Sequence, residues 1–182
     1  LGVTLKKIII WLLVVIVILI GGKYSIKKYL YPYKYEEIVN KYSYEYNLDP
    51  FLVLSVIKTE SNFNTDVESN KGAKGLMQIM DSTGEWIASK LEIDDFNTNM
   101  LYDPEINIKF GCWYLNNLLE EFGDLSLALA AYNGGSGNVT KWLSDPEYSS
   151  DGENLTYIPF KETKKYVDKV NTRYNVYKFL YE

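Results

Sequence analysis

Hydrophobic positions recur with the period of an α-helix through most of the chain. The clearest case begins at Asp49-Pro50, an N-cap acceptor followed by proline at the first helical position. From there a stripe at i, i+3, i+4 and i+7, made of Val53, Val56, Ile57 and Glu60, predicts a helix over residues 50–60. The sequence contains no internal repeat and no alternating strand pattern longer than a few residues. The fold is therefore predicted to be mainly α.

Further helices are predicted from the same period and from signals at their ends. A long helix over 104–122 should stop at Gly123, and Asp124 should cap the next helix, which should end at a glycine pair. The other predicted helices are one around residues 38–46, short ones over 75–80, 83–91 and 137–143, and a last one from about Lys161 to Tyr181.

The N-terminal apolar run indicates a membrane segment. Lys6 and Lys7 precede thirteen uninterrupted apolar residues, Ile8 to Ile20, and the run can be extended through Gly22. Thirteen residues suit a signal peptide, but no clear cleavage site follows, and the extended run approaches membrane-spanning length. We therefore favour an uncleaved anchor over a cleaved signal.

This anchor sets the expected organisation and location of the chain. Residues 1–22 should form a signal anchor, residues 23–35 a juxtamembrane linker, and residues 36–182 a single globular domain. By the positive-inside tendency, Lys6 and Lys7 should stay in the cytoplasm, although three lysines just beyond the run weaken this bias. We expect a single-pass cell-membrane protein with its domain outside the cell, or a secreted protein if the segment is cleaved.

Composition excludes several classes of chemistry. The chain has no histidine, which rules out Ser-His catalysis, Cys-His catalysis and histidine-ligated zinc. Its one cysteine, Cys112, permits neither an internal disulfide nor a cysteine-rich metal site, and is expected in the core. The net charge of −5 argues against a nucleic-acid partner. We expect no metal and no cofactor, so acid–base chemistry falls to carboxylates, lysine or tyrosine.

Glu60 occupies an unusual position for a charged residue. It falls at the end of the stripe that contains Val53, Val56 and Ile57 and faces the core. Burial disfavours the charged form of a carboxyl and raises its pKa, which suits a general acid. A structural glutamate, paired with a lysine or capping a backbone end, would explain the helix alone equally well.

Four stretches together carry a resemblance to a known family. They are Glu60-Ser61, residues 69–78 (SNKGAKGLMQ), residues 131–135 (AYNGG) and residues 158–167, which contain an E-T-x-x-Y-V core. In this order and spacing they resemble the lytic transglycosylases with the goose-type lysozyme-like (SLT) fold, over about residues 36–182. The resemblance implies a single, mainly α, lysozyme-like domain that cleaves the β-1,4 bond between N-acetylmuramic acid and N-acetylglucosamine in peptidoglycan.

The resemblance also assigns roles to individual residues. Glu60 would be catalytic, and the substrate-binding residues would be Ser69, Gln78, Met80, Tyr132, Asn133, Glu162 and Tyr166. Tyr132 would project its hydroxyl into the cleft to support the reacting sugar, or else only plug a helix end. Asn133 could equally be a turn residue, and Glu162 could be present only for the helix dipole.

Three positions depart from the family pattern without removing a reacting group. Asp81 replaces a proline, Gly134 an alanine and Lys164 an arginine. Arginine offers a bidentate fork that lysine lacks. These departures bear on how the substrate fits rather than on the chemistry.

The expected mechanism uses one carboxyl as acid and then as base. Ordinary glycosidases use two carboxylates, but the nearer candidates here, Asp66 and Glu68, lie in a polar loop that favours solvation. The resemblance implies that the N-acetyl group of the substrate assists and that the C6 hydroxyl closes a 1,6-anhydro ring. The alternatives are hydrolysis of the same bond, or a wall-binding protein without catalysis. Peptidoglycan glycan strands are the expected partner, and a monomer is the expected state.

Overall fold

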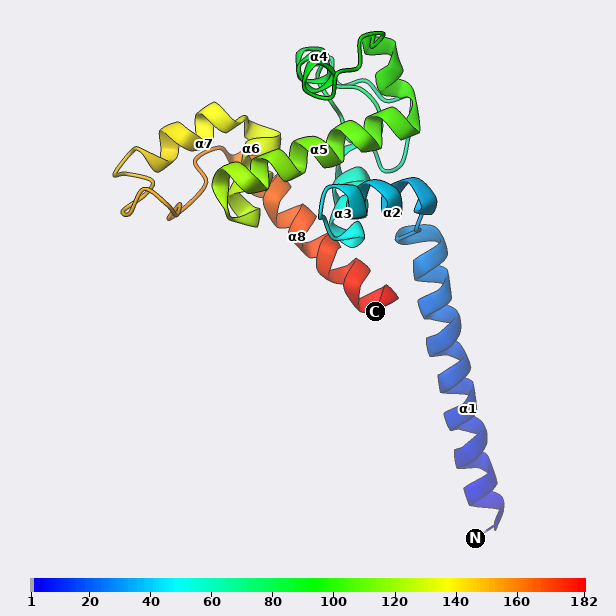
Figure 1. Cartoon of the computed structure of the whole chain (residues 1–182). Helices are drawn as coiled ribbons and strands as arrows, with labels where there is room; N and C mark the ends of the chain where they lie inside the picture. Colours follow the sequence, from blue (N-terminus) through cyan, green and yellow to red (C-terminus); the bar gives the residue numbers. More distant parts are fainter. Residues whose placement is uncertain (1) are drawn as a thin grey trace.

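The computed structural model describes residues 2–182, and the side chains from residue 6 onward (Figure 1). Its elements are α1 (Gly2–Ser25), the π-helix η1 (Ile26–Leu30), α2 (Glu36–Glu45), α3 (Pro50–Glu60), α4 (Asp81–Lys90), the 3₁₀-helix η2 (Thr98–Tyr102), α5 (Pro104–Phe122), α6 (Leu125–Gly134), α7 (Ser136–Leu143) and α8 (Lys161–Tyr181). Within residues 2–182 the only β-pairing is two isolated bridges, both at Lys74. The prediction of a mainly α fold is confirmed.

Helix ends follow the local signals in the sequence. Asp49 caps α3, because its Oδ1 accepts a hydrogen bond from the backbone N of Phe51 at 2.8 Å. Gly123 closes α5 with φ of +67°, a conformation that glycine adopts without strain. The helices predicted over 50–60 and 104–122 therefore have the bounds expected for them.

The helix predicted over residues 75–80 is wrong. Gly75 and Gln78 have φ of +75° and +52°, so the backbone turns back instead of continuing as a helix. Lys74 and Ile79 exchange backbone hydrogen bonds of 2.9 and 3.0 Å, which close a turn that we call the 74–79 turn. The apolar side chains of this stretch are buried, but from a turn. Two further differences are that α4 begins at Asp81 and that η2 was not predicted.

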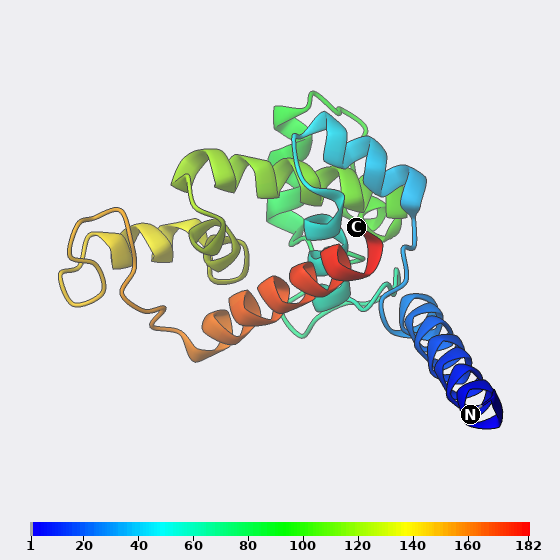
Figure 2. The same cartoon turned by 90° about the horizontal axis from the view of Figure 1, so that it is seen from below.

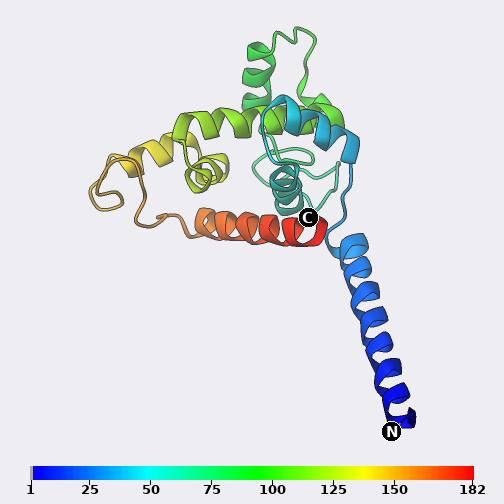
Figure 3. The same ribbon diagram turned by 60° about the horizontal axis from the view of Figure 1, so that its bottom comes forward.

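Helix α3 is the central element of the domain. It packs against α8 and α2, while α5 packs against α6 and α2 (Figures 2 and 3). Its residues from Leu52 to Ile57 are buried, and Cys112 on α5 is fully buried, as predicted. Because α3 runs through the core, its last residue, Glu60, lies where other helices meet.

Helix α1 projects away from the remaining helices, and η1 continues it to Leu30 (Figures 1 and 3). The segment predicted as a linker is thus helical over residues 23–30, and only residues 31–35 connect it to α2. The C-terminal end of α8 lies beside this inner end of α1, since Lys23 Nζ is 5.8 Å from the centroid of the Phe179 ring.

Candidate active site

A cleft of about 370 Å³ opens at the C-terminal end of α3. Four separate stretches of the sequence line it: Glu60 from α3; Ser69, Asn70, Lys71, Ala73, Gln78 and Met80 from the segment before α4; Tyr132 and Asn133 from α6; and Glu162 from α8. All the predicted site residues except Tyr166 therefore line one cleft.

Glu60 is half-buried at this cleft and is surrounded mainly by protein. Burial raises the pKa of its carboxyl from 4.5 to about 7, and the neighbouring Tyr166 hydroxyl opposes this rise. No ion pair of the described side chains involves Glu60, so the structural role of a lysine-paired glutamate finds no support. A large fraction of Glu60 is consequently protonated at neutral pH.

Tyr166 lies beside Glu60 but does not line the cleft. Its side chain is buried, and its hydroxyl makes no hydrogen bond of regular geometry among the described residues. Burial raises the pKa of Tyr166 well above its usual value, and the charge of Glu60 adds to this effect. Tyr166 therefore places a neutral hydroxyl beside Glu60, and its contact with substrate stays a prediction.

Tyr132 lines the cleft, and its hydroxyl is held by a hydrogen bond to the backbone. The hydroxyl donates to the backbone carbonyl of Met77 at 2.8 Å and so ties α6 to the 74–79 turn. Burial, followed by the charge of Glu60, raises the pKa of Tyr132. The hydroxyl of Tyr132 is therefore held in place, and the sequence carries no signal for this contact between residues 55 positions apart.

Two side chains outside the turn clamp its backbone. Ser61, directly after Glu60, donates from its hydroxyl to the carbonyl of Leu76 at 2.8 Å. The fully buried Asn107 on α5 accepts from the backbone N of Met77 at 2.7 Å and donates to the carbonyl of Lys74 at 2.9 Å. These contacts fix the turn against the end of α3, which positions the cleft residues that flank it.

Gly75 is required by a close approach of the backbone. A Cβ on this residue would lie 2.2 Å from the carbonyl oxygen of Leu101 and 2.4 Å from Nδ2 of Asn107. Only a glycine permits this close contact, whereas Gly72 has open space around it and a φ of +84°.

The polar side chains of the cleft keep free hydrogen-bonding capacity. Ser69 Oγ accepts from the backbone N of Ala73 at 2.9 Å and of Lys71 at 3.3 Å, so its own hydrogen remains to be donated. Gln78 Nε2 donates to two carbonyls of the same loop, which leaves Oε1 as an acceptor. Among the described residues the Asn133 amide makes no side-chain hydrogen bond comparable to these, so it too is available to a ligand.

Glu162 brings a second carboxylate to the cleft from the first turn of α8. It is exposed, and its charge is not among the causes that shift the pKa of Glu60. Met80 is 39% exposed and contributes an apolar edge to the cleft.

Sequence reasoning missed the lining residues Asn70 and Lys71, whose only signal was their place inside the second motif. It also missed the aromatic residues beside the cleft. Tyr114 lies 5.3 Å from Tyr132 between ring centroids, and Trp86 lies 6.1 Å from Tyr114. A run of rings thus leads from the cleft wall toward α4.

The three departures from the family pattern have local explanations. Asp81 begins α4 and binds Lys74 Nζ with both oxygens, at 2.7 and 2.9 Å, a favourable place for an acidic residue. Gly134 is the last residue of α6, where a Cβ would lie 3.1 Å from Thr163 Oγ1. Lys164 pairs with the exposed Asp168 and does not line the cleft, so its substitution does not alter the cleft wall.

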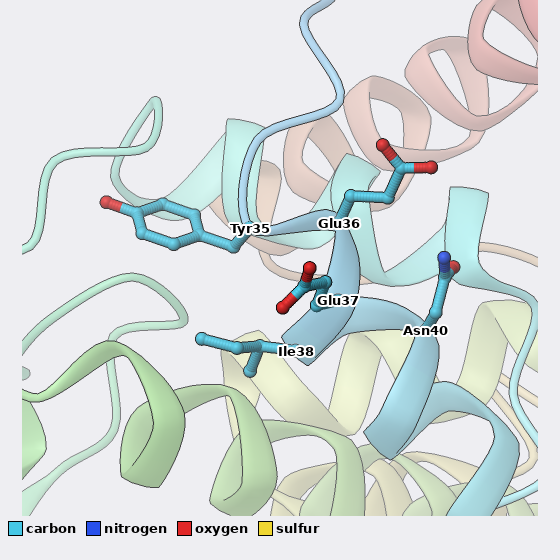
Figure 4. Close-up of a pocket in the computed structure, with 5 residues that line it drawn as sticks. All are labelled: Tyr35, Glu36, Glu37, Ile38 and Asn40. Atoms are coloured by element: carbon cyan, nitrogen blue, oxygen red, sulfur yellow. The ribbon is translucent and has the colours of Figure 1, made fainter.

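A separate hollow of about 520 Å³ lies at the start of α2 (Figure 4). It is lined by Tyr35, Glu36, Glu37, Ile38 and Asn40, whose side chains point in different directions rather than toward a common point. None of the predicted site residues lines it. We therefore take the cleft at Glu60 as the candidate active site.

Residues 37–155 match the family model described as the transglycosylase SLT domain. The soluble lytic murein transglycosylase of Salmonella typhimurium is 34% identical over 143 residues, covering 77% of this chain and 22% of that protein. The membrane-bound lytic murein transglycosylase C of Edwardsiella ictaluri is 30% identical over 172 residues, covering 80% of this chain and 47% of that protein.

A solved structure agrees with the fold as well. The X-ray structure of an inactive mutant of the lytic transglycosylase Slt from Pseudomonas aeruginosa, with glutamine in place of one glutamate, superimposes with a TM-score of 0.72. It is 29% identical in sequence, and the match covers 86% of this chain and 27% of that one. The chain thus spans less than two thirds of each of these relatives.

Proposed function

This chain belongs to the transglycosylase SLT family, and on that premise we propose that it is a peptidoglycan lytic transglycosylase. It would cleave the β-1,4 bond between N-acetylmuramic acid and N-acetylglucosamine and leave a 1,6-anhydro end. The observation that carries the proposal is Glu60, a carboxyl with a pKa of about 7 that opens on a polar cleft. A proton donor of this kind is what glycosidic cleavage requires near neutral pH.

In the first step, the protonated Glu60 donates to the glycosidic oxygen while the bond from that oxygen to the anomeric carbon breaks. The N-acetyl oxygen of the muramic acid stabilises the positive charge that develops on the anomeric carbon. Ser69, whose hydroxyl hydrogen has no partner among the described residues, is suited to orient this N-acetyl group by donating to it. The leaving sugar departs with the proton of Glu60.

In the second step, the ionised Glu60 takes the proton of the C6 hydroxyl, and the freed oxygen bonds to the anomeric carbon. Glu60 is thereby reprotonated, and no water is consumed. The neutral Tyr166 hydroxyl beside Glu60 favours the ionised form that exists between the two steps. Tyr132 would hold the sugar against the wall of the cleft while its hydroxyl remains on the 74–79 turn.

A relative with a known structure supports the importance of one glutamate. Replacement of one glutamate by glutamine is described as inactivating in the Pseudomonas structure. In this chain Glu60 is the glutamate of the cleft whose pKa is raised toward neutrality. We therefore assign to Glu60 the roles of acid and base.

Hydrolysis of the same bond is the second candidate function, and Glu162 is the observation that favours it. A second carboxylate in the cleft could activate a water molecule, as in ordinary glycosidases. Mass spectrometry of the products from purified peptidoglycan separates the two functions. We expect 1,6-anhydromuropeptides; reducing-end products, heavier by one water, would instead assign hydrolysis, and no products would remove the enzymatic proposal.

We further propose that α1 anchors the domain to the cell membrane, with the cleft on the cell-wall side. One helical stretch, Lys6–Leu30, is long and apolar enough to cross a bilayer. A relative is named as membrane-bound, and peptidoglycan lies outside the membrane. In protoplasts, externally added protease should degrade the domain; protection of the domain would reverse this topology.

A further inference from the structure

Aromatic residues of α8 hold the short connector that follows the membrane helix. Tyr181 donates its hydroxyl to the carbonyl of Tyr31 at 2.8 Å, and Tyr177 donates to the carbonyl of Pro32 at 3.1 Å. The rings of Tyr31 and Tyr177 meet edge to face with centroids 5.2 Å apart. We call this set of contacts the tyrosine clasp. Because it binds the connector at backbone carbonyls, the domain is held close to the end of η1 rather than on a free tether.

The clasp brings the last turn of α8 to the level where α1 would leave the bilayer. Lys23 Nζ lies 5.8 Å from the ring centroid of Phe179, and Lys27 Nζ lies 4.2 Å from that of Tyr181. Phe179 is 78% exposed, the most exposed phenylalanine or tyrosine of α8. An exposed aromatic ring at this height is unexplained by the packing of the domain.

The surroundings of Phe179 have the composition of a membrane interface. Tyr24, Tyr29 and Leu30 are exposed, and Lys27 and Lys28 stand at the same level. Aromatic side chains are enriched at lipid headgroups, and lysines near the surface are attracted to anionic lipids. Because the uninterrupted apolar run is short for a hydrocarbon core, the bilayer should reach toward residues 23–30 and hence toward Phe179.

Helix α8 connects this region to the candidate active site. Tyr166 lies beside Glu60 near one end of the helix, and Phe179 lies thirteen residues further along it. At about 1.5 Å per residue, the two positions are about 20 Å apart along the axis. The clasp therefore limits how far the cleft can stand from the level of Phe179.

We propose that the C-terminal turn of α8, through Phe179, is a second contact with an anionic lipid surface, and that the clasp holds the cleft within about 20 Å of the membrane. This inference rests on the proposed membrane location of α1. The proposed contact restricts the substrate to glycan strands close to the membrane. This holds whether α8 stands upright or inclined, because the distance along the helix is the largest separation possible.

The test uses the full chain in vesicles of phosphatidylcholine with phosphatidylglycerol, and fluorescent labels on single introduced cysteines. The native Cys112 is fully buried and does not compete for the label. Phe179→Cys is the test variant, and Ser150→Cys, exposed in the loop between α7 and α8, is the matched control. We expect a quencher carried on lipids near the headgroups to reduce fluorescence at position 179 several-fold more than at position 150.

Two further variants locate the contact. Along the same side of α8, quenching should fall from Phe179→Cys to Thr172→Cys, since the latter lies further from the membrane end. A label at Val14, in the middle of α1, should respond to a quencher placed deep in the lipid. Neither readout depends on cleavage of peptidoglycan, so a failure here is distinct from a failure of the proposed chemistry.

Equal quenching at positions 179 and 150 would overturn the second membrane contact. No quenching at position 14 would overturn both this inference and the anchor. If position 179 is quenched as strongly in vesicles of phosphatidylcholine alone as in the mixed vesicles, the preference for anionic lipid is overturned.

Discussion

Replacing Glu60 by glutamine should abolish lysis and, at alkaline pH, stabilise the folded domain. Glutamine keeps the shape of the side chain and its place beside the Tyr166 hydroxyl, but it cannot donate a proton as an acid. Loss of a general acid slows a reaction by about 10² to 10⁴-fold. The stabilising effect follows from the raised pKa of Glu60, because ionising a buried carboxyl opposes folding.

The magnitude and the pH window follow from the two pKa values. Below pH 4.5 Glu60 is protonated in both the folded and the unfolded chain, and the substitution should change stability little. Between 4.5 and about 7 the folded chain holds a proton that the unfolded chain has lost, so stability falls as pH rises. At about 1.4 kcal/mol for each pH unit, the accumulated cost above pH 7 is at most about 3.5 kcal/mol, and water in the cleft lowers it.

The assay is unfolding by heat and by denaturant at pH 4 and pH 8, for both proteins in the same detergent, together with clearing of purified wall suspensions. The glutamine variant should unfold at a higher temperature than the parent at pH 8, by up to about 10 °C, and at nearly the same temperature at pH 4. Glu162→Gln is the matched control, because it removes an exposed carboxylate from the same cleft. It should leave the stability profile unchanged, and its loss of activity should be smaller than that of the Glu60→Gln variant.

Two results would refute this reasoning. If the parent and the Glu60→Gln variant have the same dependence of stability on pH, the carboxyl does not ionise with a raised pKa. If the Glu162→Gln variant loses as much activity as the Glu60→Gln variant, the cleft works with two carboxylates, as a hydrolase does.

Three other outcomes are expected. Tyr166→Phe should move the alkaline limb of the pH–activity profile to higher pH, because the lost hydroxyl lowers the pKa of Glu60; an unmoved limb would contradict the contact. Gly75→Ala should reduce the free energy of unfolding by about 2 kcal/mol or more, since its Cβ would meet the Leu101 carbonyl, whereas Gly72→Ala, with open space, should cost less in the same denaturant titration. Activity should survive EDTA, because residues 2–182 hold no group of three or more metal-binding side chains; loss reversed by Ca²⁺ or Mg²⁺ would show a missed site.

The sequence was most informative where the structure depends on neighbouring residues. The start of α3 is set by Asp49 and Pro50, and the end of α5 by Gly123, so these bounds could be predicted locally. The helix predicted from the apolar period over the 74–79 turn was wrong because the period indicates which side chains are buried, not which backbone conformation buries them. A turn and a helix bury the same apolar residues there, and the left-handed backbone of Gln78 carries no strong signal in its residue type.

The cleft was predictable to the extent that motifs mark its members, and not beyond. Motif order indicated that Ser69, Tyr132 and Glu162 would meet Glu60, and all four line the cleft. The motifs could not show that Tyr166 stands beside Glu60 rather than in the cleft wall. Contacts such as these join residues far apart in the sequence and depend on how the helices pack.

The position of Glu60 at the end of α3 explains how one carboxyl can act in both proposed steps. Burial is the main cause of its raised pKa, and the last turn of a helix, where backbone carbonyls point outward, also disfavours a negative charge. With an ordinary pKa of 4.5, Glu60 would be ionised at neutral pH before it could act as an acid. With a pKa far above 7, it would be protonated throughout and could not exist as a free base for long. A value of about 7 makes Glu60 a competent acid toward the glycosidic oxygen and, once ionised, a stronger base toward the C6 hydroxyl than an ordinary carboxylate.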